Sequence, residues 1–237
     1  MKGEALAIRG LALFDLTRIF GYPYLKDDGA SLGVPIIEGL STIDSKPTRN
    51  TVAQCYTKII DDLTQSLSLL GEKFNKGKIN KWGAMVLLSR VYLYKGENAK
   101  ALKMASDAII GAEKNKYALW TNEDYPTAWG EDASYDGYDD MCITCSFYQF
   151  LKEDPKDIRL KLLSFDKKYY AYVNKYQPQR EENIEDANIP LIRLSEAYLN
   201  AAEAAVKEND NDAAVKYLDP IVKRANPDNT VVGQTIT

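Results

Sequence analysis

The sequence predicts an all-α protein made of helix hairpins, with an irregular loop-rich insertion and little strand. Three observations lead to this prediction. Apolar residues recur every three or four positions in several segments, which is the period of one helix face. Capping residues and glycines bound most of these segments. Two pairs of the segments follow one another across short polar turns, which favours hairpins over isolated helices.

The first helix is expected over residues 5–20, where the apolar residues fall on one face. Gly21 and Pro23 follow in the order that ends a helix. Residues 22–48 are rich in Gly, Pro, Ser and Asp and are expected to form a loop. The residues that share the helix face are Ile8, Ala12, Leu16, Ile19 and Phe20.

The second helix is expected to begin after Thr51, because Thr51 and Gln54 have the spacing of a capping box. Gly71 supplies its end. A third helix is expected to be capped by Asn80 and to end at Gly96. Apolar side chains at helical spacing fill both segments: Val52, Tyr56, Ile59, Ile60, Leu63, Leu67 and Leu70, then Leu87, Leu88, Val91 and Tyr92.

The fourth helix is expected to be capped by Asn98, two residues after Gly96. So short a turn predicts an antiparallel hairpin of the third and fourth helices. The alanines in this hairpin allow the two helices to approach closely. This is the pattern of a tetratricopeptide-like unit of about 34 residues. A second such hairpin is expected between Pro190 and Ala225, with a kink at Pro220. The two hairpins superimpose at an offset of 113 residues, which places Ala101, Leu102, Ala105 and Ile109 on Ala214, Val215, Leu218 and Val222.

Residues 117–151 lie between the hairpins and have a different composition. They contain seven acidic residues, seven Trp or Tyr residues, and no Lys or Arg. A short helix is expected from Ser146 to before Pro155, and an extended segment over 168–176. The predicted organisation is one domain over residues 1–237, with helical repeats at 4–114 and 190–226 and an irregular excursion at 115–189.

The composition excludes several classes of function. The 237 residues include 30 Lys or Arg and 34 Asp or Glu, a net charge of −4, with no basic run to neutralise nucleic-acid phosphates. The absence of histidine removes the commonest general base and metal ligand. No apolar run reaches the roughly 18 residues of a membrane-spanning helix. We therefore expect neither a nucleic-acid partner nor a transmembrane segment.

Cys142 and Cys145 form the one close cysteine pair. A redox site would place such a pair at a strand-to-helix turn, and a zinc site would need about two more nitrogen or sulfur ligands. Neither context is present in the sequence, since only Cys55 remains. The pair is interpreted as two small, partly buried residues, and no metal or cofactor is expected.

Six segments in sequence order resemble the SusD/RagB family. Residues 7–23, AIRGLALFDLTRIFGYP, are similar to its opening "RAlayFdLvrlyGdvP", and residues 189–204 to its "iPvlRlaEvyLnrAEA". The other four are residues 48–63, 81–109, 154–159 and 216–225. The family consists of surface-exposed outer-membrane lipoproteins of Bacteroidetes that capture nutrients, mostly glycans, for a TonB-dependent transporter of the SusC type.

The resemblance implies that this chain binds an oligosaccharide or another nutrient at the cell surface, with a SusC-like transporter as partner. Family members are usually about twice as long, begin with a lipoprotein signal and end in a further segment. None of these features is found here, so the chain is expected to be an internal portion or a short member. A lipid anchor, and with it an outer-membrane location, is implied by the resemblance alone.

Candidate binding residues lie in the excursion, because sugar sites combine exposed aromatic rings with planar polar groups. Trp120, Tyr135 and Tyr138 are the first candidates, with Asp136 beside them. Trp129 is a weaker candidate, since the family resemblance implies that it packs on the helices. Asp136, Asp139 and Asp140 are also compatible with a calcium site, although their spacing is not that of an EF-hand loop and favours a solvated acidic turn.

Two alternatives to sugar binding remain at this point. A glycoside hydrolase needs two suitably spaced carboxylates, which 34 acidic residues supply trivially, and no other catalytic motif is present, so we expect no enzyme. A tetratricopeptide-like scaffold that binds a protein partner and no sugar is the second alternative, because stacked helix hairpins form concave binding surfaces. Measurable sugar affinity would separate the scaffold from the binding protein.

Overall fold

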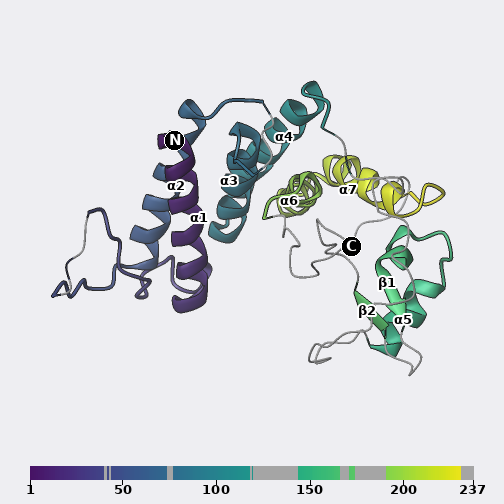
Figure 1. Cartoon of the computed structure of the whole chain (residues 1–237), viewed down its shortest axis with the longest axis horizontal. Helices are drawn as coiled ribbons and strands as arrows, with labels where there is room; N and C mark the ends of the chain where they lie inside the picture. Colours follow the sequence, from purple (N-terminus) through teal and green to yellow (C-terminus); the bar gives the residue numbers. More distant parts are fainter. Residues whose placement is uncertain are drawn as a thin grey trace, which may run out of the picture. The chain divides into compact units, whose positions relative to one another are not determined.

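The computed structural model describes residues 1–39, 42, 44–73, 77–117, 119, 144–165, 171–173 and 191–230 (Figure 1). The chain divides into two compact units. The first comprises residues 1–118, 192–218 and 236–237, and the second comprises residues 119–191 and 219–235. Each unit is described by itself below.

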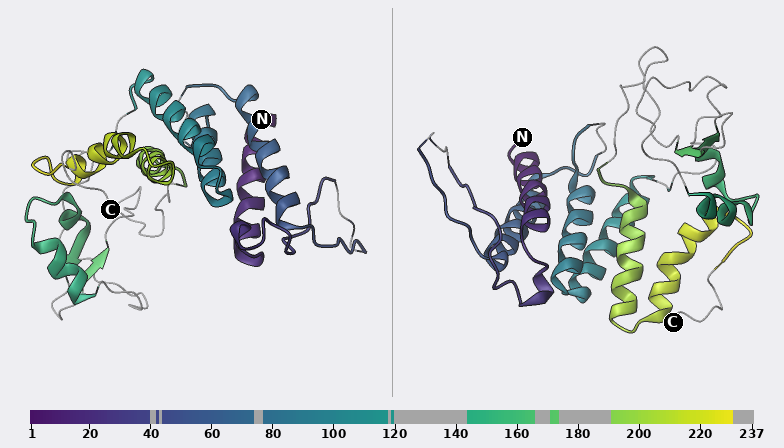
Figure 2. Two further views of the ribbon diagram at one scale, coloured as in Figure 1. Left: turned by 180° about the vertical axis from the view of Figure 1, so that it is seen from behind. Right: turned by 90° about the horizontal axis from the view of Figure 1, so that it is seen from below.

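The first unit is a stack of helices, which the views in Figures 1 and 2 show side by side. Helix α1 packs on α2, α2 on α3, α3 on α4, and both α3 and α4 on α6. Helix α7 (Asn211–Ala225) begins in this unit. The other helices are α1 (Lys2–Phe20), the 3₁₀ turn η1 (Tyr24–Lys26), α2 (Val52–Leu69), α3 (Lys81–Lys95), α4 (Asn98–Lys114) and α6 (Leu194–Lys207).

The helix ends of the first unit follow the capping residues of the sequence, with one correction. Thr51 and Gln54 form the predicted capping box, and the Asn80 side chain accepts a hydrogen bond from the Gly83 N–H at 3.0 Å. Gly96 ends α3 with φ at 81°, a left-handed conformation that glycine adopts without strain. Asn98 was expected to cap α4, but it is the first helical residue and Glu97 holds the cap position.

Helix α1 buries a face made largely of small residues. Gly3, Ala7 and Gly10 lie against α2, and a Cβ on Gly10 would stand 2.9 Å from Leu63 Cγ. This close approach buries Leu13 and Phe14 in the main core. The other core members come from α2, α3 and the loop before α2: Val34, Val52, Cys55, Tyr56, Ile59, Leu63, Leu87, Leu88 and Val91.

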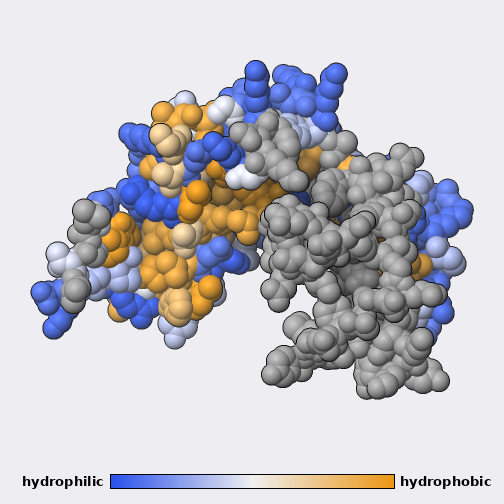
Figure 3. All heavy atoms as spheres, viewed as in Figure 1, coloured by the Kyte–Doolittle hydropathy of each residue, from blue (hydrophilic) through white to orange (hydrophobic). Residues whose placement is uncertain are grey.

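The apolar stripe identified in the first helix therefore lies on the opposite, outward side of α1. Ile8 is 62% exposed, Leu16 46% and Ile19 68%. Figure 3 shows apolar residues gathered over α1 on this side of the molecule. Close packing of the glycine and alanine face decides the orientation, because the larger residues of the stripe would hold α2 further away.

Small residues also form the contact between the α3–α4 hairpin and α6. The alanines of α4 and α6 at this contact, Ala101, Ala105, Ala201, Ala204 and Ala205, have no exposed surface. Between α3 and α6, Arg90 donates to both carboxylate oxygens of Glu196 at 2.5 and 2.7 Å. The Asn200 amide donates to the Ser89 hydroxyl at 2.9 Å. The predicted α3–α4 hairpin is confirmed, and α6 and α7 lie in the residues predicted for the other hairpin.

The second unit contains short elements. They are α5 (Cys145–Lys152), the 3₁₀ turn η2 (Ile158–Leu162), β1 (Leu163–Phe165) and β2 (Ala171–Val173). The two strands pair antiparallel, with Leu163 opposite Val173. Thr144 caps α5, two residues before the predicted Ser146, because the helix begins earlier than expected. Helix α7 continues through Pro220 and ends at Ala225.

The described residues thus form an all-α, tetratricopeptide-like protein with little strand, as predicted. Within the part of the chain that the structure describes, no helix combines the length and apolarity needed to cross a bilayer.

Candidate functional site

The residues predicted to bind ligand lie outside the described residues. These are Trp120, Trp129, Tyr135, Asp136 and Tyr138, and the same holds for Asp139 and Asp140 of the calcium alternative. The described residues nevertheless contain a polar pocket and two exposed aromatic surfaces. The sequence reasoning selected none of these.

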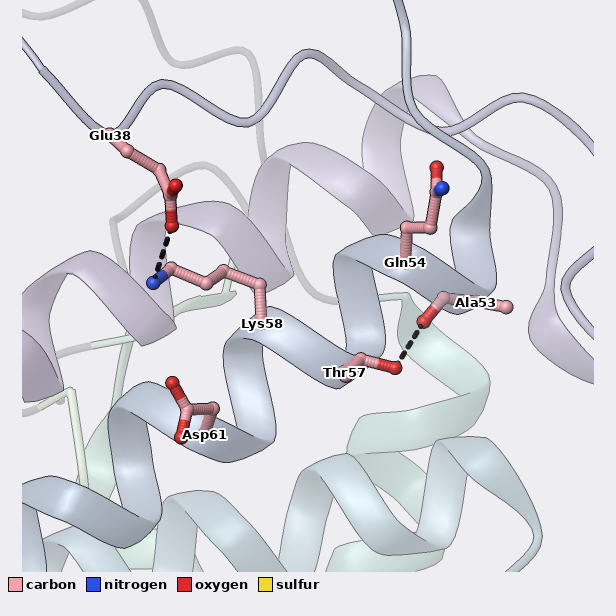
Figure 4. Close-up of a pocket in the computed structure, with 6 residues that line it drawn as sticks. All are labelled: Glu38, Ala53, Gln54, Thr57, Lys58 and Asp61. Atoms are coloured by element: carbon pink, nitrogen blue, oxygen red, sulfur yellow. Dashed lines mark hydrogen bonds and ion pairs between the residues drawn. The ribbon is translucent and has the colours of Figure 1, made fainter.

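The pocket lies on the outer side of α2 and has a volume of about 440 Å³ (Figure 4). It is open and shallow, with one wall from the loop that precedes α2. Glu38 comes from that loop. The remaining lining residues share one face of α2 because they are spaced by one, three or four positions: Ala53, Gln54, Thr57, Lys58 and Asp61.

The Lys58 ammonium links the pocket to a buried charge. Its Nζ lies 2.8 Å from Glu38 Oε1 and 3.4 Å from Asp62 Oδ1. The hydrogen bond from Lys58 lowers the pKa of Glu38, and the same bond raises the pKa of Lys58. Asp62 is wholly buried and also accepts two hydrogen bonds of 2.6 Å from Arg9 of α1. The charges of the pocket are therefore fixed in place by a network that joins α1, α2 and the loop.

The other polar groups of the pocket already have partners. Gln54 Oε1 accepts from the Thr51 N–H at 2.9 Å, Thr57 donates to the Ala53 carbonyl at 2.9 Å, and Asp61 accepts from Gln65 at 2.8 Å. A ligand hydroxyl can still reach the second lone pairs of the two carboxylates. No lining residue is aromatic, so the pocket can hydrogen-bond a polar ligand edge but offers no ring for stacking.

The first exposed aromatic surface lies where α1 ends and η1 begins, beside the end of α3. Tyr22 and Tyr94 are exposed there, and each has a cation against its ring. Lys26 Nζ lies 3.3 Å from the centre of the Tyr22 ring, and Arg18 Cζ lies 5.2 Å from that of Tyr94. A cation covers one face of each ring, and the Tyr94 ring also makes an edge-to-face contact with Phe14, with 5.4 Å between the ring centres, so both rings already have partners.

The second exposed aromatic surface is on α5. Phe147 and Phe150 are both exposed and are three residues apart, so they share a helix face. Leu151, four residues after Phe147, is buried. The spacing of these two rings in the sequence could have identified this surface. The candidates were chosen among Trp and Tyr residues, so the two phenylalanines were missed.

The described part of the chain contains no group of three or more Cys, Asp, Glu or His residues placed to hold a metal ion. The carboxylates that come together there serve hydrogen-bonded ion pairs. The chemistry that the described surfaces can perform is hydrogen bonding to hydroxyl groups and contact with apolar faces.

Two family models match the chain. Residues 1–93 match a model described as "Starch-binding associating with outer membrane", and residues 164–237 match one described as "SusD family". The first range includes α1, α2 and most of α3, and the second includes α6 and α7. A comparison with curated proteins found no match.

Solved structures give the same assignment. A candidate sugar-binding protein from Bacteroides vulgatus is 69% identical, with a TM-score of 0.91, over 99% of this chain and 59% of its own. A SusD superfamily protein from Bacteroides thetaiotaomicron is 36% identical, with a TM-score of 0.83, over 99% and 60%. Another, from Bacteroides vulgatus, is 36% identical with a TM-score of 0.81, over 96% and 59%.

This chain spans about three-fifths of the length of these relatives. The two matched regions and the relative that is 69% identical over 99% of this chain give one assignment. The chain belongs to the SusD/RagB family.

Proposed function

We propose that this chain is a glycan-binding subunit of an outer-membrane uptake system of the SusC/SusD type, which captures an oligosaccharide at the cell surface for a TonB-dependent transporter. The match of residues 1–93 to a starch-binding family model carries the proposal. The 69% identical relative, described as a candidate sugar-binding protein, supports it. Membrane attachment in this proposal depends on a lipid anchor, as the family resemblance implies.

Binding in this proposal is by stacking and hydrogen bonding, with no chemical step and no cofactor. The aromatic residues Trp120, Tyr135 and Tyr138 supply the rings, with Trp129 and Asp136 as further contacts. The α2 pocket supports a second role in holding hydroxyl groups, because Glu38 and Asp61 present carboxylate oxygens to solvent there. Separate variants test the contribution of the excursion and that of the α2 pocket to sugar affinity.

The test is a titration with soluble oligosaccharides, followed by intrinsic tryptophan fluorescence and by calorimetry. Maltoheptaose and laminarihexaose are suitable first probes. Saturable quenching that Trp120→Ala abolishes would support sugar binding at the excursion. The matched control is Trp82→Phe, which removes a tryptophan in the helical unit and should keep the calorimetric affinity. A folded wild-type chain that binds no member of the panel would contradict the proposal.

The role of the α2 pocket has its own arm of this experiment. Lys58→Met and Glu38→Gln change the charges that line the pocket without touching an aromatic residue. If the pocket holds hydroxyl groups of the ligand, both should lower the affinity about tenfold, the loss of one or two hydrogen bonds to charged groups. Unchanged affinity in both variants would remove the pocket from the site.

The transporter partnership is tested by expressing the chain together with the SusC-type protein of the organism that encodes the chain. The two should co-purify in detergent, and sugar affinity should persist in the complex. Co-purification without sugar binding would favour the alternative, a protein-interaction scaffold.

A further inference from the structure

Four helix ends meet at one edge of the first unit. They are the start of α1, the end of α2, the start of α3 and the end of α4, and the α2–α3 connection runs along the same edge (Figure 1). A Cβ on Gly3 of α1 would stand 2.9 Å from Leu69 Cβ of α2. The amide of Asn80, which caps α3, donates to the hydroxyl of Tyr117, just after α4, at 3.3 Å. The side chains of these four ends therefore form one surface.

This surface has a surplus of positive charge. Among the described residues of the four helix ends and the α2–α3 connection there are six lysines and three glutamates, a surplus of three positive charges, whereas the whole chain carries −4. The glutamates are Glu4, Glu72 and Glu113. We call the six lysines the lysine face: Lys2, Lys73, Lys78, Lys81, Lys114 and Lys116.

Most of the lysine face is not neutralised by carboxylates. Lys78 lies 3.9 Å from Glu4, and Lys81 lies 3.2 Å from Glu72. The other four lysines form no ion pair with any described residue, and three of them, Lys2, Lys114 and Lys116, are fully in the exposed class together with Lys73. Their charges therefore act on whatever approaches this edge from solvent.

Exposed lysines elsewhere in the first unit do have carboxylate partners. The Nζ atom of each lies within 2.5 to 2.8 Å of a carboxylate oxygen. These pairs are Lys100 with Glu97, Lys103 with Asp107, and Lys207 with Glu203. The unpaired charge is thus a local property of the lysine face and not of the whole surface.

Helix stability does not explain the lysine face. A lysine in the last turn of a helix, such as Lys114 of α4, complements the helix dipole. Lys2 and Lys81, however, are the first residues of α1 and α3, where the dipole favours an acidic side chain. A binding role accounts for cations at both kinds of helix end.

The arrangement of the lysines indicates the shape of the ligand. Helix α1 packs on α2, α2 on α3, and α3 on α4, so the four ends follow one another in a row. Packed helices have axes about 8–10 Å apart, which spreads the lysines over roughly 25–30 Å. Figure 3 shows hydrophilic residues gathered over the end of α4 on this edge. A linear polymer with repeated negative charges can contact the whole row, whereas a small anion would meet only one or two lysines.

We propose that the lysine face binds an acidic oligosaccharide, a glycan with carboxylate or sulfate groups along its length. The lysine ammonium is a point charge that suits either group. The choice of a glycan among linear polyanions rests on the proposed function. The lysine face includes no residue of the excursion or of the α2 pocket, so it is a separate binding surface.

The test is calorimetric titration with hexagalacturonate and with a sulfated heparin hexasaccharide, which separate carboxylate from sulfate recognition. Maltoheptaose is the neutral comparison. The lysine-face variant removes three unpaired charges with Lys73→Gln, Lys114→Gln and Lys116→Gln. The matched control removes the same charge elsewhere in the unit with Lys100→Gln, Lys103→Gln and Lys207→Gln. Circular dichroism checks that both variants are folded.

At least one acidic probe should bind the wild-type chain. Its affinity should fall roughly 20-fold between 50 and 200 mM NaCl, the dependence expected for about three neutralised charges on a flexible polyanion. At 50 mM NaCl the lysine-face variant should bind it at least about tenfold more weakly, and the control variant should differ from wild type by less than about twofold. The affinity for maltoheptaose should be equal in all three proteins, because that ligand carries no charge.

Trp82 reports on the place of binding, because Lys81 Nζ lies 5.3 Å from the centre of its ring. The chain has three tryptophans, so Trp120→Phe with Trp129→Phe leaves Trp82 alone. Addition of the acidic probe should then give a saturable change in fluorescence. The change should be lost when the three lysine-face substitutions are added.

Four results would overturn the inference. One is binding of maltoheptaose but of neither acidic probe, which would leave the proposed function standing, whereas binding of no sugar at all would contradict both. Another is an equal loss in the lysine-face and control variants, which would show a general effect of charge. A third is equally tight binding of a single-stranded DNA hexanucleotide, which would show attraction to any polyanion. The last is binding to phosphatidylglycerol vesicles alone, lost in the lysine-face variant, which would make a membrane the occupant.

Discussion

The α1–α2 and α3–α4 hairpins are both pairs of packed helices, but different contacts hold them together. Only Gly96 and Glu97 separate α3 from α4, so their pairing is local and rests on small residues such as Gly111 against the Trp82 ring. The α1–α2 pair also packs through small residues, Gly3 and Gly10 among them, but has in addition Asp62, a wholly buried carboxylate bound by Arg9 and Lys58. Proximity along the chain makes one hairpin nearly self-sufficient, whereas the other needs polar contacts between distant residues.

The connection between α1 and α2 shows the same dependence. Arg49 donates to three backbone carbonyls, those of Phe20 at 2.8 Å, Leu32 at 3.1 Å and Gly33 at 2.6 Å. It thereby fastens the loop to the carbonyl end of α1, where a cation also complements the helix dipole. No equivalent is needed in the α3–α4 hairpin, because its turn is only two residues long.

Asp62→Ala should have the largest effect, because it removes the buried ion pair of the α1–α2 hairpin. It leaves Arg9 and Lys58 without their shared buried partner, and we expect a loss of about 3 kcal/mol in the free energy of unfolding, at the lower end for a broken buried pair since Arg9 reaches solvent. Urea unfolding followed by circular dichroism measures it. Asp61→Ala, the exposed neighbour, is the control and should change stability by under about 0.5 kcal/mol. Equal losses in the two variants would contradict this account of the hairpin.

Gly111→Ala tests the α3–α4 hairpin. A Cβ at this position would lie 2.2 Å from Trp82 Cζ3, so the indole must move, and we expect a loss of about 2 kcal/mol. The measurement is a double-mutant cycle with Trp82→Leu, whose smaller side chain should remove most of the clash. If Gly111→Ala is neutral, or if Trp82→Leu fails to rescue it, the close contact does not limit this hairpin.

Arg49→Met should have a smaller effect that is confined to the first hairpin. It keeps the length of the side chain but loses three hydrogen bonds to carbonyls, and we expect about 1 kcal/mol, since Arg49 is partly solvated. Hydrogen exchange should then accelerate in residues 27–50 and stay unchanged in α3 and α4. Acceleration in both hairpins would argue against a local role.

The smallest effect is the pH dependence of the Glu38 and Lys58 pair. The pKa of Glu38 is lowered in the folded state, so the pair stabilises the protein above the ordinary glutamate pKa of about 4.3, and this stabilisation is lost as the pH falls. The difference in urea midpoint between the wild-type chain and Glu38→Gln should therefore be present at pH 7 and vanish near pH 3. A difference that persists at pH 3 would exclude an electrostatic origin.

Much of the helical structure could be predicted because it is set by neighbouring residues. The capping box at Thr51, the cap at Asn80 and the left-handed Gly96 all act within one turn of chain, so their sequence patterns suffice. The misplaced caps at Asn98 and Ser146 were errors of one or two residues between similar polar side chains. Such errors are inherent in reading boundaries from local pattern.

The α2 pocket could not be predicted, because its parts are brought together by tertiary contacts. Glu38 and Lys58 are 20 residues apart, and neither belongs to a recognisable motif. The aromatic candidates Trp120, Tyr135 and Tyr138 remain predictions of the sequence.

The sequence by itself determined that the chain folds into alanine-rich helix hairpins and belongs to the SusD/RagB family. Periodicity and capping are properties of short stretches, and the family match follows from the order of such stretches. Only the tertiary structure decided which side of α1 is buried. Both sides are apolar, so the period of the pattern cannot distinguish them. The small residues Gly3, Ala7 and Gly10 allow α2 to approach closely, and that packing leaves Ile8, Leu16 and Ile19 on the outer side.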